Sequence, residues 1–335
     1  MGQMEGSAAT ISTDFGALEQ HRRELTAYCY RMLGSPFEAE DAVQEALIRA
    51  WRGLERFEGR SQLRSWLYRI ATNVCLDMLD GRKRRALPMD LGPARDPGGP
   101  IGGTRSAIEW VEPAPDELLV APDGDPAEVA QARETIRLAF VAALQNLPAR
   151  QRAVLILCEV LRWKAAEAAE LLDSSVASVN SALQRARATL EQSDLTAAGT
   201  APPSELGEED RALLARYVEA FEDYDMERLA SLIQEDAEQS MPPYELWLRG
   251  REDILRWWSG PGIGCKGSRV LPTRAANGAP AFAQYRVSER GPGHDAWALQ
   301  VLEIEDGSIV GFTFFLDTDA VFPLFGLPLH LPPQE

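Results

Sequence analysis

The chain has 335 residues, of which 45% are hydrophobic, and a formal net charge of −17 at pH 7. This length is too great for one average domain and predicts two or three. No apolar run reaches the length of a membrane span, and the N-terminal residues lack the basic start and apolar core of a signal peptide, so we expect a cytoplasmic protein with no membrane partner. The four cysteines are far apart, which indicates neither a disulfide scaffold nor a zinc site, and we expect no metal or cofactor.

The net acidity does not exclude DNA binding, because the charge is segregated along the chain. Residues 21–85 contain 13 Lys and Arg against 9 Asp and Glu, a balance of +4, whereas residues 201–335 contain 11 against 23, a balance of −12. Basic segments therefore lie where nucleic acid could bind, and acidic segments lie elsewhere.

The first part of the chain predicts a small helical unit. Residues 1–16 are small and polar, and we expect them to be disordered. A helix is predicted over 15–33, and a second helix follows from Phe37, with its apolar side formed by Ala42, Val43, Ala46, Leu47, Ala50, Trp51 and Leu54. After a polar loop around Gly59, a third helix begins near Leu63 and ends before four adjacent cations, Arg82, Lys83, Arg84 and Arg85.

The third helix has an outer face on which we place Arg64, Tyr68, Arg69, Thr72, Asn73 and Asp77. Arginine, aromatic and amide groups followed by four cations suit a nucleic-acid backbone with some base contact. A solvated helix face with a basic C-terminal turn explains the same residues, since cations there complement the helix dipole. Composition by itself favours this second interpretation.

The next two segments are a linker and a second helical unit. Residues 86–125 are acidic and rich in Pro and Gly, with an apolar island around Trp110, which is typical of a linker. Helices are predicted over 126–146 and from Pro148, and then comes a short helix, a turn and a longer helix that Ser175 would cap. A helix-turn-helix would present to a DNA major groove the residues Ser178, Asn180, Ser181, Gln184, Arg185 and Arg187; a plain helical hairpin is the alternative.

A third unit follows a short linker. Three helices are predicted between Glu208 and Trp258, and then four stretches with a period of two, separated by turns such as Asn277-Gly278 and Asp306-Gly307. Three helices before a curved four-stranded antiparallel sheet make an α+β cone with a pocket at its open end, for which the candidate residues are Tyr244, Trp247 and Gln284. No Asp/His pair has a spacing that indicates catalysis, so we assign no catalytic residue. The apolar tail 320–335 is expected to lie across another domain.

The segments DAVQEALIRAW, WLYRIATNVCLDML and RKRR resemble region 2 of the sigma-70 family of RNA polymerase sigma factors, in the extracytoplasmic-function group. The resemblance implies that Asp41, Gln44 and Glu45 dock on the polymerase clamp helices. It also implies contacts to the opened −10 promoter element, which would involve Phe57, Gly59, Arg60, Arg69, Asn73, Asp77 and Arg82 to Arg85.

The segments LPARQRAVLILCEVL and SVASVNSALQRARATL resemble sigma region 4, which implies that the helix-turn-helix reads the −35 element. Asn180 and Ala182 stand where the family commonly has Lys and Arg, so the promoter sequence does not carry over. The third unit resembles SnoaL-like domains on its element order and on MPPYELWLRGREDI. The expected organisation is region 2 over 17–86, a linker over 87–127, region 4 over 128–195, a second linker over 196–206, and a SnoaL-like domain with the tail over 207–335.

These resemblances imply two all-α sigma domains followed by an α+β SnoaL-like cone. The expected function is that of a sigma factor that binds core RNA polymerase and promoter DNA, is not an enzyme, and is regulated in cis by its C-terminal domain, with an unknown small ligand as a further partner. The sign of that regulation is left open. The alternative is a SnoaL-like enzyme fused to a DNA-binding regulator.

Overall fold

The first helical unit is a three-helix packing preceded by one helical turn. The computed structural model describes residues 15–57, 62–121, 125–191 and 206–333. The helix expected over 15–33 is divided by a turn into α1 (Phe15–Glu19) and α2 (Arg22–Leu33), and α3 (Pro36–Gly53) and α4 (Leu63–Leu79) follow, with the 3₁₀ turn η1 (Leu54–Arg56) between them. Ser35 caps α3 by accepting a hydrogen bond from the Glu38 amide at 3.3 Å, and Gly34 ends α2 in the left-handed region.

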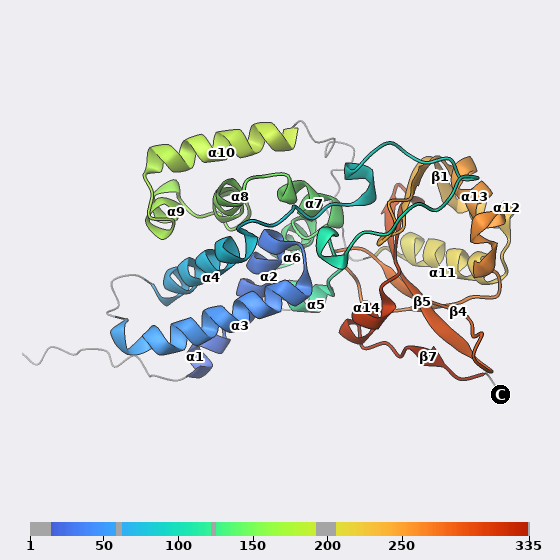
Figure 1. Ribbon diagram of the computed structural model, residues 1–335, viewed down its shortest axis with the longest axis horizontal. Coiled ribbons are helices and arrows are strands. Elements are labelled where there is room, and N and C mark those ends of the chain that lie inside the picture. The colour runs from blue at the N-terminus through green and yellow to red at the C-terminus, as the bar shows by residue number, and fades with distance from the viewer. Residues whose placement is uncertain (1–14, 58–61, 122–124, 192–205, 334–335) are drawn as a thin grey trace, which may run out of the picture.

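The linker crosses from the first unit to the C-terminal domain and returns (Figure 1). It contains the short turns η2 (Pro88–Asp90) and η3 (Ala107–Glu109) and one helical turn, α5 (Asp116–Leu119). Backbone hydrogen bonds join Arg95 to Trp247 and Arg105 to Pro243, and the apolar island around Trp110 and Val111 is buried. The two ends of the linker are therefore packed, whereas most residues from 90 to 108 are exposed and are attached to the C-terminal domain by backbone hydrogen bonds.

The second helical unit contains the expected helix-turn-helix. The helix predicted over 126–146 is two helices, α6 (Pro126–Glu134) and α7 (Leu138–Gln145), and α8 (Ala149–Leu155) continues into a π-helical turn, η4 (Ile156–Val160). The motif itself is α9 (Ala165–Leu171) and α10 (Val176–Glu191). Ser175 caps α10 as predicted, since its hydroxyl accepts from the Ser178 amide at 3.1 Å.

The C-terminal domain is an α+β cone. The helices α11 (Glu208–Glu222), α12 (Met226–Leu232) and α13 (Arg251–Ser259), with the turn η6 (Pro261–Cys265), cover one face of a seven-stranded sheet. Its strands are β1 (Ile233–Ser240), β2 (Trp247–Arg249), β3 (Arg269–Pro272), β4 (Ala281–Val287), β5 (His294–Glu305), β6 (Ser308–Phe315) and β7 (His330–Leu331). The main path runs β2-β1-β6-β5-β4-β3, and β7 pairs with β5.

The expected fold class is confirmed, but the sheet is larger than predicted. The antiparallel strands β3 to β6 form as expected. The sequence interpretation missed β1, which pairs parallel to β6, together with β2 and β7. Residues 233–240 carry mostly polar side chains, and their partner strand β6 lies about seventy residues away in sequence, so neither composition nor a neighbouring turn signals this strand.

Two hydrophobic cores meet at the sheet. The inner face packs with α11 to α13 around aromatic residues such as Tyr217, Trp258 and Phe312. The outer face, with Tyr285 and Leu299, belongs to one continuous core that also includes both helical units and the linker. The apolar tail forms α14 (Thr318–Leu324), and Phe322 packs on Tyr285 with ring centroids 5.3 Å apart. The first part of the tail, with Val321, Phe322 and Phe325, is buried against the sheet of its own domain and not across another domain as predicted, and Leu329 is 43% exposed.

Candidate polymerase and promoter interfaces

The outer face of α3 carries the residues expected to bind polymerase. Asp41 and Gln44 are exposed, and the half-buried Glu45 accepts a hydrogen bond from Arg49 at 2.7 Å. Ile48 and Trp51 lie on the exposed side as well, with 37% and 47% of their surface exposed. The prediction that Trp51 faces the core was wrong: the indole extends the exposed face. Exposed apolar groups beside carboxylate and amide groups are typical of a protein-binding surface.

The outer face of α4 is narrower than predicted. Arg69, Asn73 and Asp77 are exposed at steps of four residues, so they share one side of the helix. Tyr68 and Thr72, which we placed on the same face, are fully buried. The two are turned inward because the Thr72 hydroxyl bonds to that of Tyr28 at 2.7 Å, and Tyr68 packs on Trp163 with ring centroids 5.2 Å apart.

The loop before α4 is described only at its edges. Phe57 packs on Trp66 with ring centroids 4.9 Å apart, which anchors the start of the loop on α4. The predicted base-capturing residues Gly59 and Arg60 lie outside the described residues. Of the expected capture loop, only Phe57 is therefore placed.

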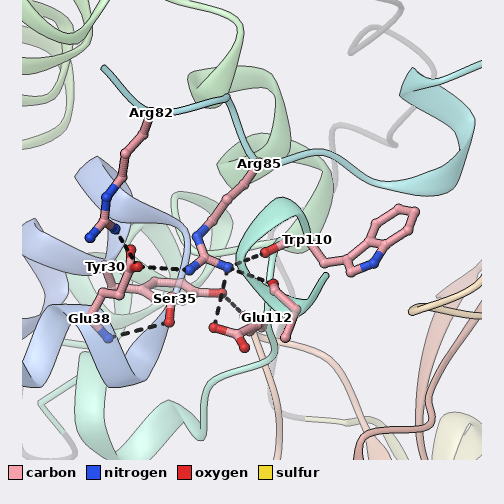
Figure 2. A network of polar contacts seen from close by, with 8 residues as sticks. Tyr30, Ser35, Glu38, Arg82, Arg85, Trp110 and Glu112 are labelled. Carbon is pink, nitrogen blue, oxygen red and sulfur yellow. Dashed lines mark hydrogen bonds and ion pairs between the residues drawn. The ribbon is translucent and has the colours of Figure 1, made fainter. Parts of the chain in front are cut away.

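The basic segment after α4 is occupied by internal contacts (Figure 2). The Arg85 side chain is only 6% exposed, and its guanidinium forms ion pairs with Glu38 at 3.2 Å and with Glu112 at 3.4 Å. The same guanidinium donates to the Trp110 carbonyl at 2.6 Å. In this conformation Arg85 cannot contact a DNA phosphate, which corrects the expectation that it belongs to an exposed backbone clamp.

The other three cations differ in their availability. Arg82 also pairs with Glu38, at 2.5 Å, and Arg84 donates to the side-chain oxygen of Asn146. Lys83 is 81% exposed and lies 3.8 Å from Glu109. Oxygen atoms of the linker and of the helices thus bind the arginine side chains in place of DNA phosphate oxygens. Both kinds of oxygen are hydrogen-bond acceptors that carry full or partial negative charge.

The linker is held at this position by two further groups. The Tyr30 hydroxyl donates to the Glu112 carbonyl at 2.8 Å, and the Glu112 amide donates to the Gly34 carbonyl at 3.0 Å. Burial raises the pKa of the Glu112 carboxyl above its ordinary value, although the charge of Arg85 opposes this effect. The network therefore joins α2, α3, the basic segment and the linker.

The recognition helix α10 keeps an open outer face. All six residues expected to meet DNA are exposed: Ser178, Asn180, Ser181, Gln184, Arg185 and Arg187. Arg185 donates to the Ser181 hydroxyl at 2.7 Å, and Arg187 pairs with Glu159. In contrast to the basic segment, this surface is accessible without a rearrangement of the fold.

Comparisons with known proteins agree with this geometry. Residues 17–85 match sigma-70 region 2, residues 137–190 match sigma-70 region 4, and residues 214–312 match the SnoaL-like domain. The ECF RNA polymerase sigma factor SigG of Mycobacterium tuberculosis is 47% identical over 321 residues, which cover 94% of this chain and 84% of SigG. This chain belongs to the ECF RNA polymerase sigma factors.

Two other relatives differ in how much of this sigma factor they cover. SigW of Bacillus subtilis is 29% identical over 51% of this chain and 82% of its own length. The crystal structure of the extracytoplasmic function sigma factor SigJ of Mycobacterium tuberculosis aligns over 94% of this chain and 100% of its own, with a TM-score of 0.58 and 21% identity. The likeness to SigJ shows that the two chains share a fold that includes the C-terminal domain.

Regions 2 and 4 of this sigma factor are in direct contact. Arg69, on the exposed face of α4, donates to the Glu170 carbonyl in α9 at 2.8 Å. Arg31 of α2 donates to the Thr135 hydroxyl at 2.7 Å, and Arg152 of α8 donates to the Met32 carbonyl and to Gln145. One residue of the expected −10 surface, Arg69, thus contacts region 4 while it remains exposed.

The two buried arginines make this contact costly. Burial lowers the pKa of both Arg31 and Arg152 to about 10, and among the described residues neither pairs with a carboxylate. Both remain charged at pH 7, and a buried charge with only neutral hydrogen-bond partners costs several kcal/mol relative to water.

The residues expected to line a pocket in the cone do not come together. Gln284 is fully buried in a hydrogen-bonded row with Ser268, Gln300 and Tyr217, whose links measure 2.8 to 3.0 Å. Trp247 instead lines a cleft of about 700 Å³ between the outer sheet face, the linker and α7, and Tyr244 forms a backbone bridge with Thr104 of the linker. Carboxylates at the cleft wall include Asp90, Asp236, Glu238, Glu303 and Glu305.

Two findings concern the described residues as a whole. None of their helices is long and apolar enough to cross a membrane. No group of three or more His, Cys, Asp or Glu among them could hold a metal ion.

Proposed function

We propose that this sigma factor is regulated in cis by a closed state, in which its C-terminal domain and linker hold regions 2 and 4 together and keep Arg82 and Arg85 of the −10 surface paired within the protein. The observation that carries the proposal is the internal pairing of Arg82 and Arg85 with Glu38 and Glu112. As a sigma factor, the protein binds core RNA polymerase and promoter DNA; we assign the polymerase contact to Asp41, Gln44 and Glu45 with Ile48 and Trp51.

In the open state, the −10 contact would be made by Arg69, Asn73 and Asp77, by the loop with Phe57, Gly59 and Arg60, and by the basic segment 82–85. The −35 contact would be made by the exposed face of α10. Elements named −10 and −35 lie about 25 base pairs apart, roughly 85 Å along B-DNA. Regions that touch at 2.8 Å between Arg69 and Glu170 do not span that distance, so promoter binding requires them to separate.

The C-terminal domain supports closure through its contacts with the linker. The outer face of its sheet shares one hydrophobic core with both helical regions, and Arg105 of the linker pairs with Glu245 at 2.6 Å. Separation of regions 2 and 4 would expose part of that core to water, which the hydrophobic effect opposes. According to this proposal, the C-terminal domain inhibits promoter binding. We place the site for a regulatory small ligand in the cleft beside Trp247 rather than in the filled interior of the cone. The site of action is the cytoplasm, where core polymerase works.

The test compares the full chain with a chain truncated after Ser204. Both are mixed with purified core polymerase and a promoter library, and start sites and promoter affinity are measured. We expect the truncated chain to bind promoters roughly tenfold or more tightly, because it no longer has to be opened. Circular dichroism of the truncated chain checks that its helices remain folded. Equal affinities and equal start-site selection by the two chains would contradict cis regulation and favour an independent C-terminal module.

A further inference from the structure

One turn of the C-terminal domain reaches into the junction between region 2, the linker and region 4. It connects β3 to β4, and Asn277 at its tip is only 1% exposed. The Asn277 side chain donates from Nδ2 to the Tyr30 hydroxyl and to the Ile136 carbonyl, both at 2.6 Å, and its Oδ1 accepts from the Ala114 amide at 2.8 Å. Both amide hydrogens and the carbonyl oxygen are thus used, each toward a different segment of the sigma part.

The backbone of the same turn is paired with the linker. The Asn277 amide donates to the Ala114 carbonyl at 3.1 Å, and the Asp116 amide donates to the Ala275 carbonyl at 3.0 Å. The Gly278 amide donates to the Asp116 carboxylate at 2.7 Å. Gly278 has a φ of +75°, and a Cβ there would lie 3.1 Å from the Arg133 carbonyl, so both conformation and space favour glycine.

These contacts continue directly into the network of Figure 2. The Tyr30 hydroxyl accepts from Asn277 and donates to the Glu112 carbonyl, and the Glu112 carboxylate pairs with Arg85. Glu112 of the linker, which pairs with Arg85, is therefore connected to the turn of the C-terminal domain through the Tyr30 hydroxyl.

We propose that the Asn277-Gly278 turn is the latch of the closed state: it fixes the linker against Arg85 and bridges region 2 to region 4, and its withdrawal frees the basic segment and lets the regions separate. This inference rests on the cis regulation proposed above and names the contact that performs it. Such a latch would offset part of the cost of the interface between regions 2 and 4, which buries Arg31 and Arg152 without carboxylate partners among the described residues.

The test is the full-length variant Asn277→Gly. Asn277 has a φ of +54°, which glycine adopts freely, so the variant retains the turn and removes only the three side-chain hydrogen bonds. The matched control is Asp306→Gly: Asp306 precedes Gly307 in another two-residue turn, has a φ of +47°, and is exposed. A second variant, Tyr30→Phe, retains the buried ring and removes the hydroxyl that connects Asn277 to Glu112.

Three measurements are made on each full-length variant. They are the affinity of the core polymerase complex for promoter DNA, the radius of gyration by small-angle scattering, and hydrogen exchange of the Ala114 amide. For Asn277→Gly we expect promoter affinity to rise roughly tenfold or more, toward that of the chain truncated after Ser204, because three buried hydrogen bonds are lost. The radius should increase and the Ala114 amide should exchange faster. Tyr30→Phe should give a smaller shift in the same direction, and Asp306→Gly none.

The outcomes separate this inference from the function on which it rests. If truncation raises affinity and Asn277→Gly does not, the latch is refuted and cis regulation stands. If neither raises affinity, both fail. An equal rise for Asn277→Gly and Asp306→Gly would mean that loosening any turn opens the protein, which also refutes the latch.

Discussion

At the scale of single residues, position in the fold separates cations that look equivalent in sequence. Four adjacent cations follow α4, yet Lys83 is 81% exposed and Arg85 is 6% exposed. Glu38 and Glu112 flank Arg85, and both carboxylates are largely buried around it. Removal of a buried partner leaves the opposite charges unpaired, which costs far more than removal of an exposed one.

We therefore predict that two alanine substitutions in this segment differ strongly in their effect on stability. Arg85→Ala should lower the free energy of unfolding of the full chain by about 3 kcal/mol, because Glu38 and Glu112 lose their buried partner. Lys83→Ala should change it by less than about 0.5 kcal/mol and should reduce the salt slope of promoter binding by about one. Urea unfolding and a salt titration of promoter affinity measure these quantities. A larger stability loss for Lys83→Ala than for Arg85→Ala would be incompatible with the network.

At the scale of elements, α3 presents two faces with different purposes. Ala42, Val43 and Ala46 are buried, whereas Asp41, Gln44 and Ile48 are exposed on the other side. The buried face positions the helix, and the exposed face is the surface to which we assign the polymerase contact. Changes to the exposed face should act on binding and leave the packing intact.

The substitution Asp41→Arg should weaken binding to core polymerase at least roughly tenfold, because a charge reversal inside an interface introduces repulsion and unpaired groups. The melting temperature should stay within a few degrees of that of the unchanged chain. Glu227→Arg is the matched control, since Glu227 is an exposed acid on α12 and undergoes the same change of charge. Co-purification with core polymerase is the measurement, and an equal loss for both variants would point to net charge as the cause.

At the scale of the whole molecule, the proposed closure should be accompanied by proton uptake. Burial raises the pKa of Glu112, which faces Arg85, Glu38 and Asp317, and that of Asp116, which faces Arg133, above the ordinary values. An acid whose pKa is raised in the closed state stabilises that state when the pH is below the ordinary pKa of the acid. This stabilisation is lost as the pH rises through the raised pKa. Opening, which returns both groups to water, should therefore be easier at higher pH.

The expected result is a smaller radius of gyration and weaker promoter binding at pH 5.5 than at pH 7.5. In the Asp116→Asn variant, this dependence should be reduced, because the Asp116 carboxyl no longer titrates while the oxygen that accepts from Gly278 is retained. Small-angle scattering at the two pH values measures the change. An opposite trend, with expansion on acidification while circular dichroism shows an intact fold, would contradict the proposed linkage.

The sequence by itself determined the helices with a strong period, such as α3, α4 and α10, since each has an apolar stripe and a cap or stop that acts within a few residues. It also determined the antiparallel strands β3 to β6, whose turns are local. Only the tertiary structure decided that Tyr68 and Arg85 are buried and that β1 is a strand. Their partners, Trp163, Glu112 and β6, lie 27 to more than 70 residues away in sequence, and no local pattern encodes a contact at that separation.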